Sequence, residues 1–151
     1  MRTPLAALLL ALSAAVSGCE SAAPAIKAAT SNAQSLFGDW ALAQLGGKDV
    51  ASLVPEGGKT PNLAIANDGR ISGSTGVNNI MSSLDLGKLA KGDFSLTPVA
   101  STMMAGSPEA MSLESSFLKA LGEVKNFNLD GNALNLTNGK ETLLKFLRAG
   151  S

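Results

Sequence analysis

The chain has 151 residues and a net charge of zero, with twelve basic and twelve acidic side chains. This balance argues against a nucleic-acid partner, which would call for a basic patch. The chain has no histidine and only one cysteine, Cys19. A Ser/His/Asp triad is therefore excluded, and we expect no metal, because zinc and copper sites normally use histidine or cysteine ligands. We also expect no cofactor.

The N-terminus has the features of a bacterial lipoprotein signal peptide. Arg2 gives a short basic start, and residues 5–16 are apolar or small and carry no charge. The sequence Val-Ser-Gly-Cys at residues 16–19 matches a lipobox, in which the cysteine is acylated and becomes the new N-terminus. We predict cleavage between Gly18 and Cys19 and lipidation of Cys19 by fatty acids such as palmitate. The alternative is an ordinary secretory signal with a chance cysteine.

Lipidation would consume the only thiol and anchor the chain to a membrane. The apolar run itself is shorter than the roughly 20 residues that span a bilayer, whereas several acyl chains on one residue anchor stably. An aspartate after the cysteine often retains a lipoprotein in the inner membrane, and here Glu20 stands in that position. We therefore expect a lipid anchor in the outer membrane, facing the periplasm, with the inner membrane as the alternative.

The segment after the signal differs in composition from the rest. Residues 19–36 are rich in alanine and serine, with Pro24 and a single Lys27, and show no sustained apolar period. We predict a lipidated cysteine followed by a flexible tether; a frayed helix is the alternative, since alanine favours helix. A single folded domain is expected over residues 37–151.

Residues 39–45 alternate between apolar and other side chains and predict the first strand. The alternation places Trp40 and Leu42, and by continuation Gln44, on one face. The two glycines that follow are expected to end this strand.

The next part of the domain reads as several short strands joined by turns. A second strand is predicted over residues 62–66, and the Asn-Asp-Gly sequence at 67–69 indicates a tight turn. Ile71 opens a further strand, and the small polar residues 72–76 favour a bulge or a sharp bend. Residues 77–86 are expected to continue as an irregular strand.

One helix is predicted over residues 107–122. Ser107 is a capping residue, Pro108 suits the first helical position and Glu109 complements the helix dipole. Apolar residues recur behind it at helical spacing, at Leu113, Phe117, Leu121 and Val124.

Further short strands complete the pattern. One lies before the helix and three after it, at residues 94–96, 127–129, 133–136 and 142–147. Many short strands with one helix predict an α+β, mostly β fold. We expect a curved antiparallel sheet or partial barrel whose open face is covered by the helix.

Four segments, in their order and spacing, identify a family. They read Trp-Ala-Leu at 40–42, Ile-Ser-Gly-Ser-Thr-Gly-Val-Asn-Asn at 71–79, Pro-Val-Ala-Ser-Thr-Met-Met-Ala at 98–105, and Glu-Ser-Ser-Phe-Leu-Lys-Ala-Leu at 114–121. Together they resemble the META domain family of HslJ-like heat-shock and envelope lipoproteins, over about residues 37–147. The resemblance implies a compact β-rich fold with one helix and a role in envelope stress tolerance or at the cell surface. It implies no enzymatic activity.

The chain departs from the family pattern at two positions. Members often carry cysteines where this chain has Val77 and Gly106. A thiol or disulfide role implied by the family therefore does not apply here, and Val77 is expected to pack as a small apolar side chain.

Two loops are the candidate partner-binding surfaces. They contain Ser74, Thr75, Asn78 and Asn79 in the first loop, and Thr102, Met103 and Met104 in the second. The first loop lacks the Gly-Lys-Ser/Thr ending of a phosphate cradle, so we expect a tight bend whose two asparagines bond the local backbone. The methionine pair would form either an adaptable contact surface or, as we favour, a filling for an irregular gap in the core. Copper(I) binding by methionines has no support from their spacing.

The sequence offers little for catalysis. The acidic residues form no recognisable pair, and a Ser-x-x-Lys match at Ser116 and Lys119 lies mid-helix, where a structural role is simpler. We therefore expect no enzyme but an envelope lipoprotein that supports cell-envelope homeostasis through an envelope protein partner. A periplasmic inhibitor or chaperone-like module is the alternative, and a hydrolase is a third possibility.

Overall fold

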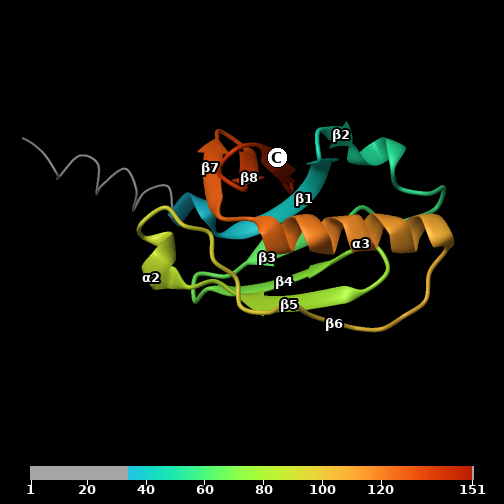
Figure 1. Ribbon diagram of the computed structural model, residues 1–151, viewed down its shortest axis with the longest axis horizontal. Coiled ribbons are helices and arrows are strands. Elements are labelled where there is room, and N and C mark those ends of the chain that lie inside the picture. The colour runs from blue at the N-terminus through green and yellow to red at the C-terminus, as the bar shows by residue number, and fades with distance from the viewer. Residues whose placement is uncertain (1–33, 151) are drawn as a thin grey trace, which may run out of the picture.

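The computed structural model describes residues 34–150. The predicted signal peptide, Cys19 and most of the predicted tether lie outside the described residues. The described chain folds as an open, mostly β structure with one main helix, which confirms the predicted fold class (Figure 1). Its strands are β1 (Gly38–Leu45), β2 (Lys48–Asp49), β3 (Asn62–Ile65), β4 (Arg70–Ser74), β5 (Asn79–Ser83), β6 (Ala100–Ser101), β7 (Asn126–Asp130), β8 (Ala133–Thr137) and β9 (Thr142–Arg148).

All the strands belong to one antiparallel sheet. Its order is β6-β5-β4-β3-β1-β9-β8-β7, with β2 paired to β1 outside this path. The first and last strands of the domain, β1 and β9, are therefore neighbours at the middle of the sheet. The main helix, α3 (Pro108–Glu123), crosses one face and contacts β1 and β9 (Figure 1).

Helix α3 begins where the sequence predicted. The Ser107 side chain accepts a hydrogen bond from the N–H of Ala110 at 3.2 Å, and Pro108 occupies the first turn. The helix ends at Glu123, one residue later than predicted, because Val124 adopts an extended conformation. The buried face carries Leu113, Phe117 and Leu121 toward the sheet.

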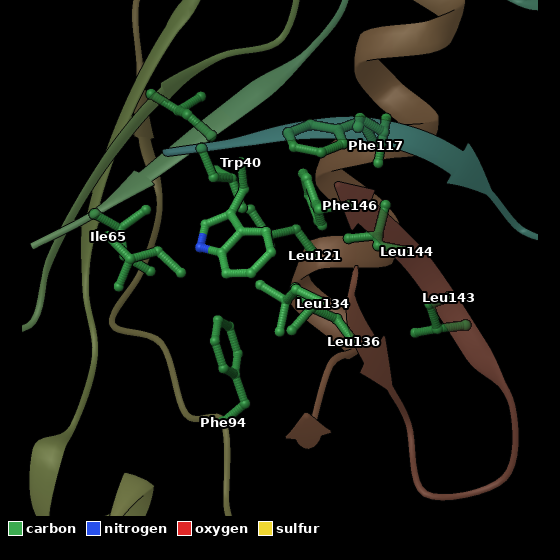
Figure 2. Packing of buried hydrophobic residues seen from close by; sticks show 14 of the residues in the cluster. Trp40, Ile65, Phe94, Phe117, Leu121, Leu134, Leu136, Leu143, Leu144 and Phe146 are labelled. Atoms are coloured by element: carbon green, nitrogen blue, oxygen red, sulfur yellow. The ribbon is translucent and has the colours of Figure 1, made fainter. Parts of the chain in front are cut away.

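The core lies between α3 and the sheet, with Trp40 near its centre (Figure 2). Phe117 of α3 meets Phe146 of β9 edge to face, with ring centroids 6.3 Å apart and planes at 74°. Phe94, in the loop after α2 (Leu86–Leu89), packs against Phe127 of β7, with ring centroids 6.2 Å apart. The indole N–H of Trp40 donates to the carbonyl oxygen of Leu36 at 2.8 Å, so this buried donor is satisfied.

The domain begins earlier than the sequence predicted. Leu36, assigned to the tether, is fully buried in the core. Arg148 at the end of β9 donates hydrogen bonds to the carbonyl oxygens of Phe37 and Ser35 and stacks over Trp40, 4.4 Å from the ring centroid. The chain around Leu36 is thus bound to the end of β9, so the boundary at residue 37 was wrong.

Strand β1 contains a bulge that the alternation did not predict. Leu42 pairs with Phe146 whereas Gln44 pairs with Lys145, so Ala43 is the extra residue. Because of the extra residue, the side chains after Ala43 lie on the opposite face from the one that simple alternation predicts. Gln44 is therefore exposed, contrary to its predicted place beside Leu42, and Leu45 is buried instead.

Of the bulge or sharp bend predicted at residues 72–76, the structure has the bend, which begins at Thr75, and no bulge. Ser72, Gly73 and Ser74 lie in regular pairing with β3 and β5, and the chain turns only after them. The irregular strand predicted over residues 77–86 is shorter than expected, since β5 covers Asn79–Ser83 and Leu84 makes an isolated bridge to Leu96. Residues 94–96 form no regular strand beyond that bridge.

Two short helices were not predicted. They are the 3-10 turn η1 (Val50–Ser52) and α2 (Leu86–Leu89), each capped by an aspartate side chain. Both are single turns too short to show an apolar period. The three strands after α3 agree with the prediction to within one residue at each end.

Candidate functional site

A buried polar cluster joins the two loops that the sequence marked as candidate surfaces. It consists of Thr75, Asn78 and Glu114, which are 1%, 2% and 7% exposed. Thr75 and Asn78 lie in the turn between β4 and β5, and Glu114 lies in α3. We call these three residues the Asn78 cluster.

The turn itself is built by Thr75. Its N–H donates to the carbonyl oxygen of Asn78 at 2.8 Å, and its Oγ1 accepts from the N–H of Asn78 at 2.9 Å. Gly76 has φ = 95°, in the left-handed region that favours glycine, and its N–H donates to Ser74 Oγ. These bonds close the bend and point the Asn78 side chain inward.

The Asn78 amide meets the Glu114 carboxylate. Asn78 Nδ2 lies 3.0 Å from Oε1 and 2.9 Å from Oε2, and the Thr75 hydroxyl lies 3.1 Å from Oε2. The buried Glu114 carboxylate thus accepts hydrogen bonds from neutral donors in the β4–β5 turn, where Asn78 lies 36 residues before Glu114. No ion pair with Glu114 occurs within residues 34–150.

The other side of Asn78 holds the second loop. Its Oδ1 accepts from the Met104 N–H at 2.6 Å and from the Thr102 hydroxyl at 2.8 Å, and its Nδ2 donates to the Met104 carbonyl oxygen at 3.1 Å. The Asn78 side chain therefore pairs with the Met104 backbone much as a neighbouring strand would. The prediction that this asparagine bonds the local backbone with its side chain was wrong, because the amide reaches across to residues 102–114.

The predicted site residues accordingly separate into two groups. Thr75 and Asn78 are buried and engaged internally, so they are not available to a partner. Asn79, Thr102, Met103 and Met104 are exposed and Ser74 is half-buried. The structure brings both loops together through the Asn78 cluster and leaves the second loop as the outer surface.

The methionines lie outside the core. Met103 is 99% exposed and Met104 is 52% exposed, and Met81 and Met111 are exposed too. Our preference for core filling by Met103 and Met104 was therefore wrong. The core is filled by leucine, isoleucine, valine, phenylalanine and tryptophan side chains instead.

Val77 and Gly106, the two positions where the family resemblance placed cysteines, face each other. A Cβ at Gly106 would lie 2.9 and 3.1 Å from the two methyl groups of Val77. Val77 is half-buried and packs over Gly106, as the sequence predicted for a small apolar side chain. This contact is a second link between the two loops, independent of the Asn78 cluster.

Sequence reasoning did not find the buried role of Glu114. The signal was present, because Glu114 lies three and seven residues before Phe117 and Leu121 and so shares their face of α3. A glutamate on the apolar face of a helix needs hydrogen-bond donors from elsewhere in the fold. Those donors come from a turn whose proximity no local pattern shows.

The remaining chemistry of the described residues is sparse. Ser116 and Lys119 are both exposed on α3. Within residues 34–150, no three acidic, cysteine or histidine side chains gather closely enough to hold a metal ion.

An open groove of about 630 Å³ runs along the outer side of β3, β4 and β5, and none of the Asn78 cluster residues line it. None of the described helices has the length and apolar character needed to cross a membrane.

The fold and the two linked loops define a small antiparallel β protein with one covering helix, and comparison with known families assigns its class. The META domain family profile matches residues 34–151, and the chain therefore belongs to the META domain family. This confirms the resemblance seen in the sequence. No curated protein matches the chain.

Two solved structures share the fold. An NMR structure of a protein from Burkholderia xenovorans has a TM-score of 0.62 and 23% identity, covering 80% of this chain and 88% of that one. A second NMR structure has a TM-score of 0.58 and 24% identity, covering 78% of this chain and 94% of the other. At this identity the likeness concerns the fold alone.

Proposed function

We propose that this META domain protein is a non-enzymatic lipoprotein of the bacterial envelope that supports envelope homeostasis under stress by binding another envelope protein. The observation that carries the binding role is the position of Met103. Its side chain is almost fully exposed, and the buried Asn78 amide fixes the adjacent Met104 backbone by two hydrogen bonds. The lipobox at residues 16–19 supports the anchor.

The surface formed by Met103 and Met104 suits a protein partner. Methionine is unbranched and polarisable and adapts to irregular apolar surfaces. Asn78 holds the segment through two hydrogen bonds with the Met104 backbone, one donated and one accepted, and a third accepted from the Thr102 hydroxyl. Binding would therefore order fewer residues. Residues 94–108 carry no charge, which favours a neutral apolar contact over an anionic one.

The place of this surface fits an N-terminal anchor. The described chain enters β1 near α2, at one end of the molecule, whereas the segment between β6 and α3 passes round the opposite end (Figure 1). An anchor attached ahead of residue 34 would therefore join the domain at the end opposite to the segment between β6 and α3 (Figure 1). A partner in the periplasm or peptidoglycan layer would have free access to it.

Photocrosslinking in intact cells tests the binding role. A photoreactive amino acid at Met103 is expected to capture one envelope protein reproducibly, and capture should increase under envelope stress. The matched control places the same group at Glu56, an exposed loop residue on another part of the surface. Equal labelling from both positions, or no adduct from Met103, would contradict a partner at this surface.

Replacement of Cys19 tests the anchor separately. Cys19→Ala should abolish incorporation of labelled palmitate and shift the protein from the membrane fraction, while the fold is kept. Retained palmitate in Cys19→Ala would show that the lipobox interpretation is wrong. Separation on a sucrose gradient distinguishes the outer membrane, which we propose, from the inner one.

A periplasmic inhibitor or chaperone-like module is the second candidate, and the exposure of Met103 and Met104 favours it equally. A holdase would suppress aggregation of chemically unfolded proteins of unrelated sequence, whereas a specific binder would not. Suppression that is lost in Met103→Ser would select this candidate over the first.

A further inference from the structure

We infer that β6 and the extended residues after it form a self-pairing edge, at which a second copy of this chain adds antiparallel to the first. The inference concerns association of the folded domain and does not depend on lipidation or on an envelope partner. It rests on three features: the directions of the backbone N–H and C=O groups of residues 100–104, the absence of charge in this segment, and the charged and partly covered β7 edge on the opposite side of the sheet.

In residues 100–104, the backbone N–H and C=O groups of every second residue point toward β5. The N–H of Thr102 donates to Asn79 O at 3.0 Å, and the N–H of Met104 donates to Asn78 Oδ1. Ala100 pairs with Met81 in the same alternation. In an antiparallel ladder the intervening N–H and C=O groups, those of Ser101 and Met103, point away from the sheet. They form a short row of backbone groups on the open side.

The Asn78 cluster keeps this row extended beyond the strand itself. β6 has only two residues, but the Asn78 side chain takes over pairing with Met104 where β5 ends. The segment is thereby held in line from Ala100 to Met104. Pro98 limits the row on its other side, because proline has no N–H to donate.

The opposite edge of the sheet lacks these properties. β7 is flanked by Lys125 and ends at Asp130, and it is partly covered by the chain before it. Asp93 bridges to Asn126, and the N–H of Phe94 donates to Lys125 O at 2.7 Å. Charges and covering chain are the usual ways in which edges avoid pairing. The β6 edge carries no charge, since residues 94–108 are uncharged, and none of the described strands pairs with its outer side.

A second copy of the same edge is the occupant that these features fit. With a two-fold axis at Thr102, the outward N–H and C=O groups of Ser101 meet those of Met103 of the second copy, and the converse pair forms by symmetry. Neutral segments do not repel each other, and the chain without residues 1–18 has eleven basic and twelve acidic residues, so long-range repulsion is small too. Pairing would also cover part of Met103, which is 99% exposed in the single chain, so the dimer and a complex with an envelope protein at Met103 would exclude each other.

Sedimentation velocity of the intact protein, purified in a density-matched detergent, tests the association. The unaltered protein should shift from monomer to dimer with rising concentration. Met103→Glu places two like charges diagonally across the axis and should raise the concentration needed for half-dimerisation by about two- to fivefold. The matched control is Asn128→Glu on β7, which should dimerise like the unaltered protein. Far-ultraviolet circular dichroism checks that each variant is folded.

Amide hydrogen exchange tests the geometry. The N–H groups of Ser101 and Met103 should become protected as the dimer forms, while that of Asn128 should not change. Three results would overturn the inference: a monomer at every concentration up to about 1 mM, a dimer that leaves these amides unprotected, or a dimer that Met103→Glu does not weaken. Crosslinks to other proteins from Ser101, with a purified monomer, would assign the edge to a different partner and would also contradict self-pairing.

Discussion

The amide of Asn78 lies 2.9 and 3.0 Å from the two carboxylate oxygens of Glu114, although the residues are 36 positions apart. Asn78 Nδ2 carries two hydrogens. One points to the Met104 carbonyl oxygen, and the other is shared by the carboxylate oxygens. A single buried side chain therefore connects the β4–β5 turn, the exposed methionine segment and the main helix.

Asn78→Ala should lower the free energy of unfolding by about 3 kcal/mol. The change removes the amide donor from a buried carboxylate and releases the Met104 backbone. Chemical unfolding in urea, followed by the fluorescence of the only tryptophan, Trp40, measures it. Asn79→Ala is the control, since that side chain is exposed, and it should change stability by less than about 0.5 kcal/mol. Equal effects from both variants would contradict the internal role of Asn78.

Cysteines at positions 77 and 106 should form a disulfide. The side chain of Val77 already reaches the point where a Cβ at Gly106 would lie. Val77→Cys with Gly106→Cys should stabilise the oxidised protein by about 3 kcal/mol, because the closed loop restricts the unfolded chain. The thermal midpoint should fall on reduction. The single variant Val77→Cys should show no such response to reductant; if the double variant also shows none, the two loops are farther apart than described.

Two glycine substitutions should act in opposite directions. In Gly73→Ala the new methyl would lie 2.2 Å from Asn62 O in the neighbouring strand, so β3 or β4 must shift. We expect a loss of about 2–4 kcal/mol. In Gly122→Ala the methyl meets no atom within 4 Å, and the helix gains about 0.5–1 kcal/mol. Urea unfolding of both variants measures the pair, and a stable Gly73→Ala would show that the strands have room.

Arg148→Ala should loosen the start of the domain. Arg148 stacks on Trp40 and donates to the carbonyl oxygens of Phe37 and Ser35. Its loss should cost about 1–2 kcal/mol and speed amide exchange around Leu36. Arg148→Lys keeps the charge but not the planar fork, so an intermediate effect is expected. If Arg148→Lys matched the unaltered protein, charge alone would account for the contact.

Asp68 should add a small stabilisation that is lost in acid. The backbone N–H of Arg70 and then its side chain hydrogen-bond to the carboxylate and lower the pKa of Asp68 from its ordinary value. The folded state thus favours the ionised form, so the contribution is present above the ordinary aspartate pKa and lost as pH falls through the lower, folded value. Titration by carbon-13 NMR measures this pKa. Arg70→Ala keeps the backbone N–H and removes only the side-chain hydrogen bond, so we expect the pKa of Asp68 to return partway toward the ordinary range. An unchanged pKa would exclude Arg70 side-chain hydrogen bonding as a cause.

The fold class was predictable because its signals are local. Ser107 and Pro108 mark the start of α3, and Gly131 and Gly139 mark the turns of the last three strands. The order of the strands was not predictable, since the pairing of β1 with β9 joins residues 99 to 108 positions apart. Likewise the bulge at Ala43 is set by its partner strand, and the sequence around it shows only alternation.

The candidate site was predictable only as a set of residues. The sequence selected both loops, but it did not separate the buried Thr75 and Asn78 from the exposed Met103. That separation depends on Glu114, whose place opposite the β4–β5 turn follows from how α3 crosses the sheet. A polar residue on an apolar helix face was the available signal for it.

The central position of β9 has a consequence for the order of folding. Five strands on one side of the sheet, from β6 to β1, meet the meander of β7 to β9 only along the β1–β9 pairing. β1 is synthesised long before β9, so one edge of β1 stays unpaired until residues 142–148 emerge. The chain can therefore complete its sheet only after β9 has been made, and contacts of such long range make folding slow. A truncation of only the last ten residues would remove the strand at the middle of the domain, not one at its edge.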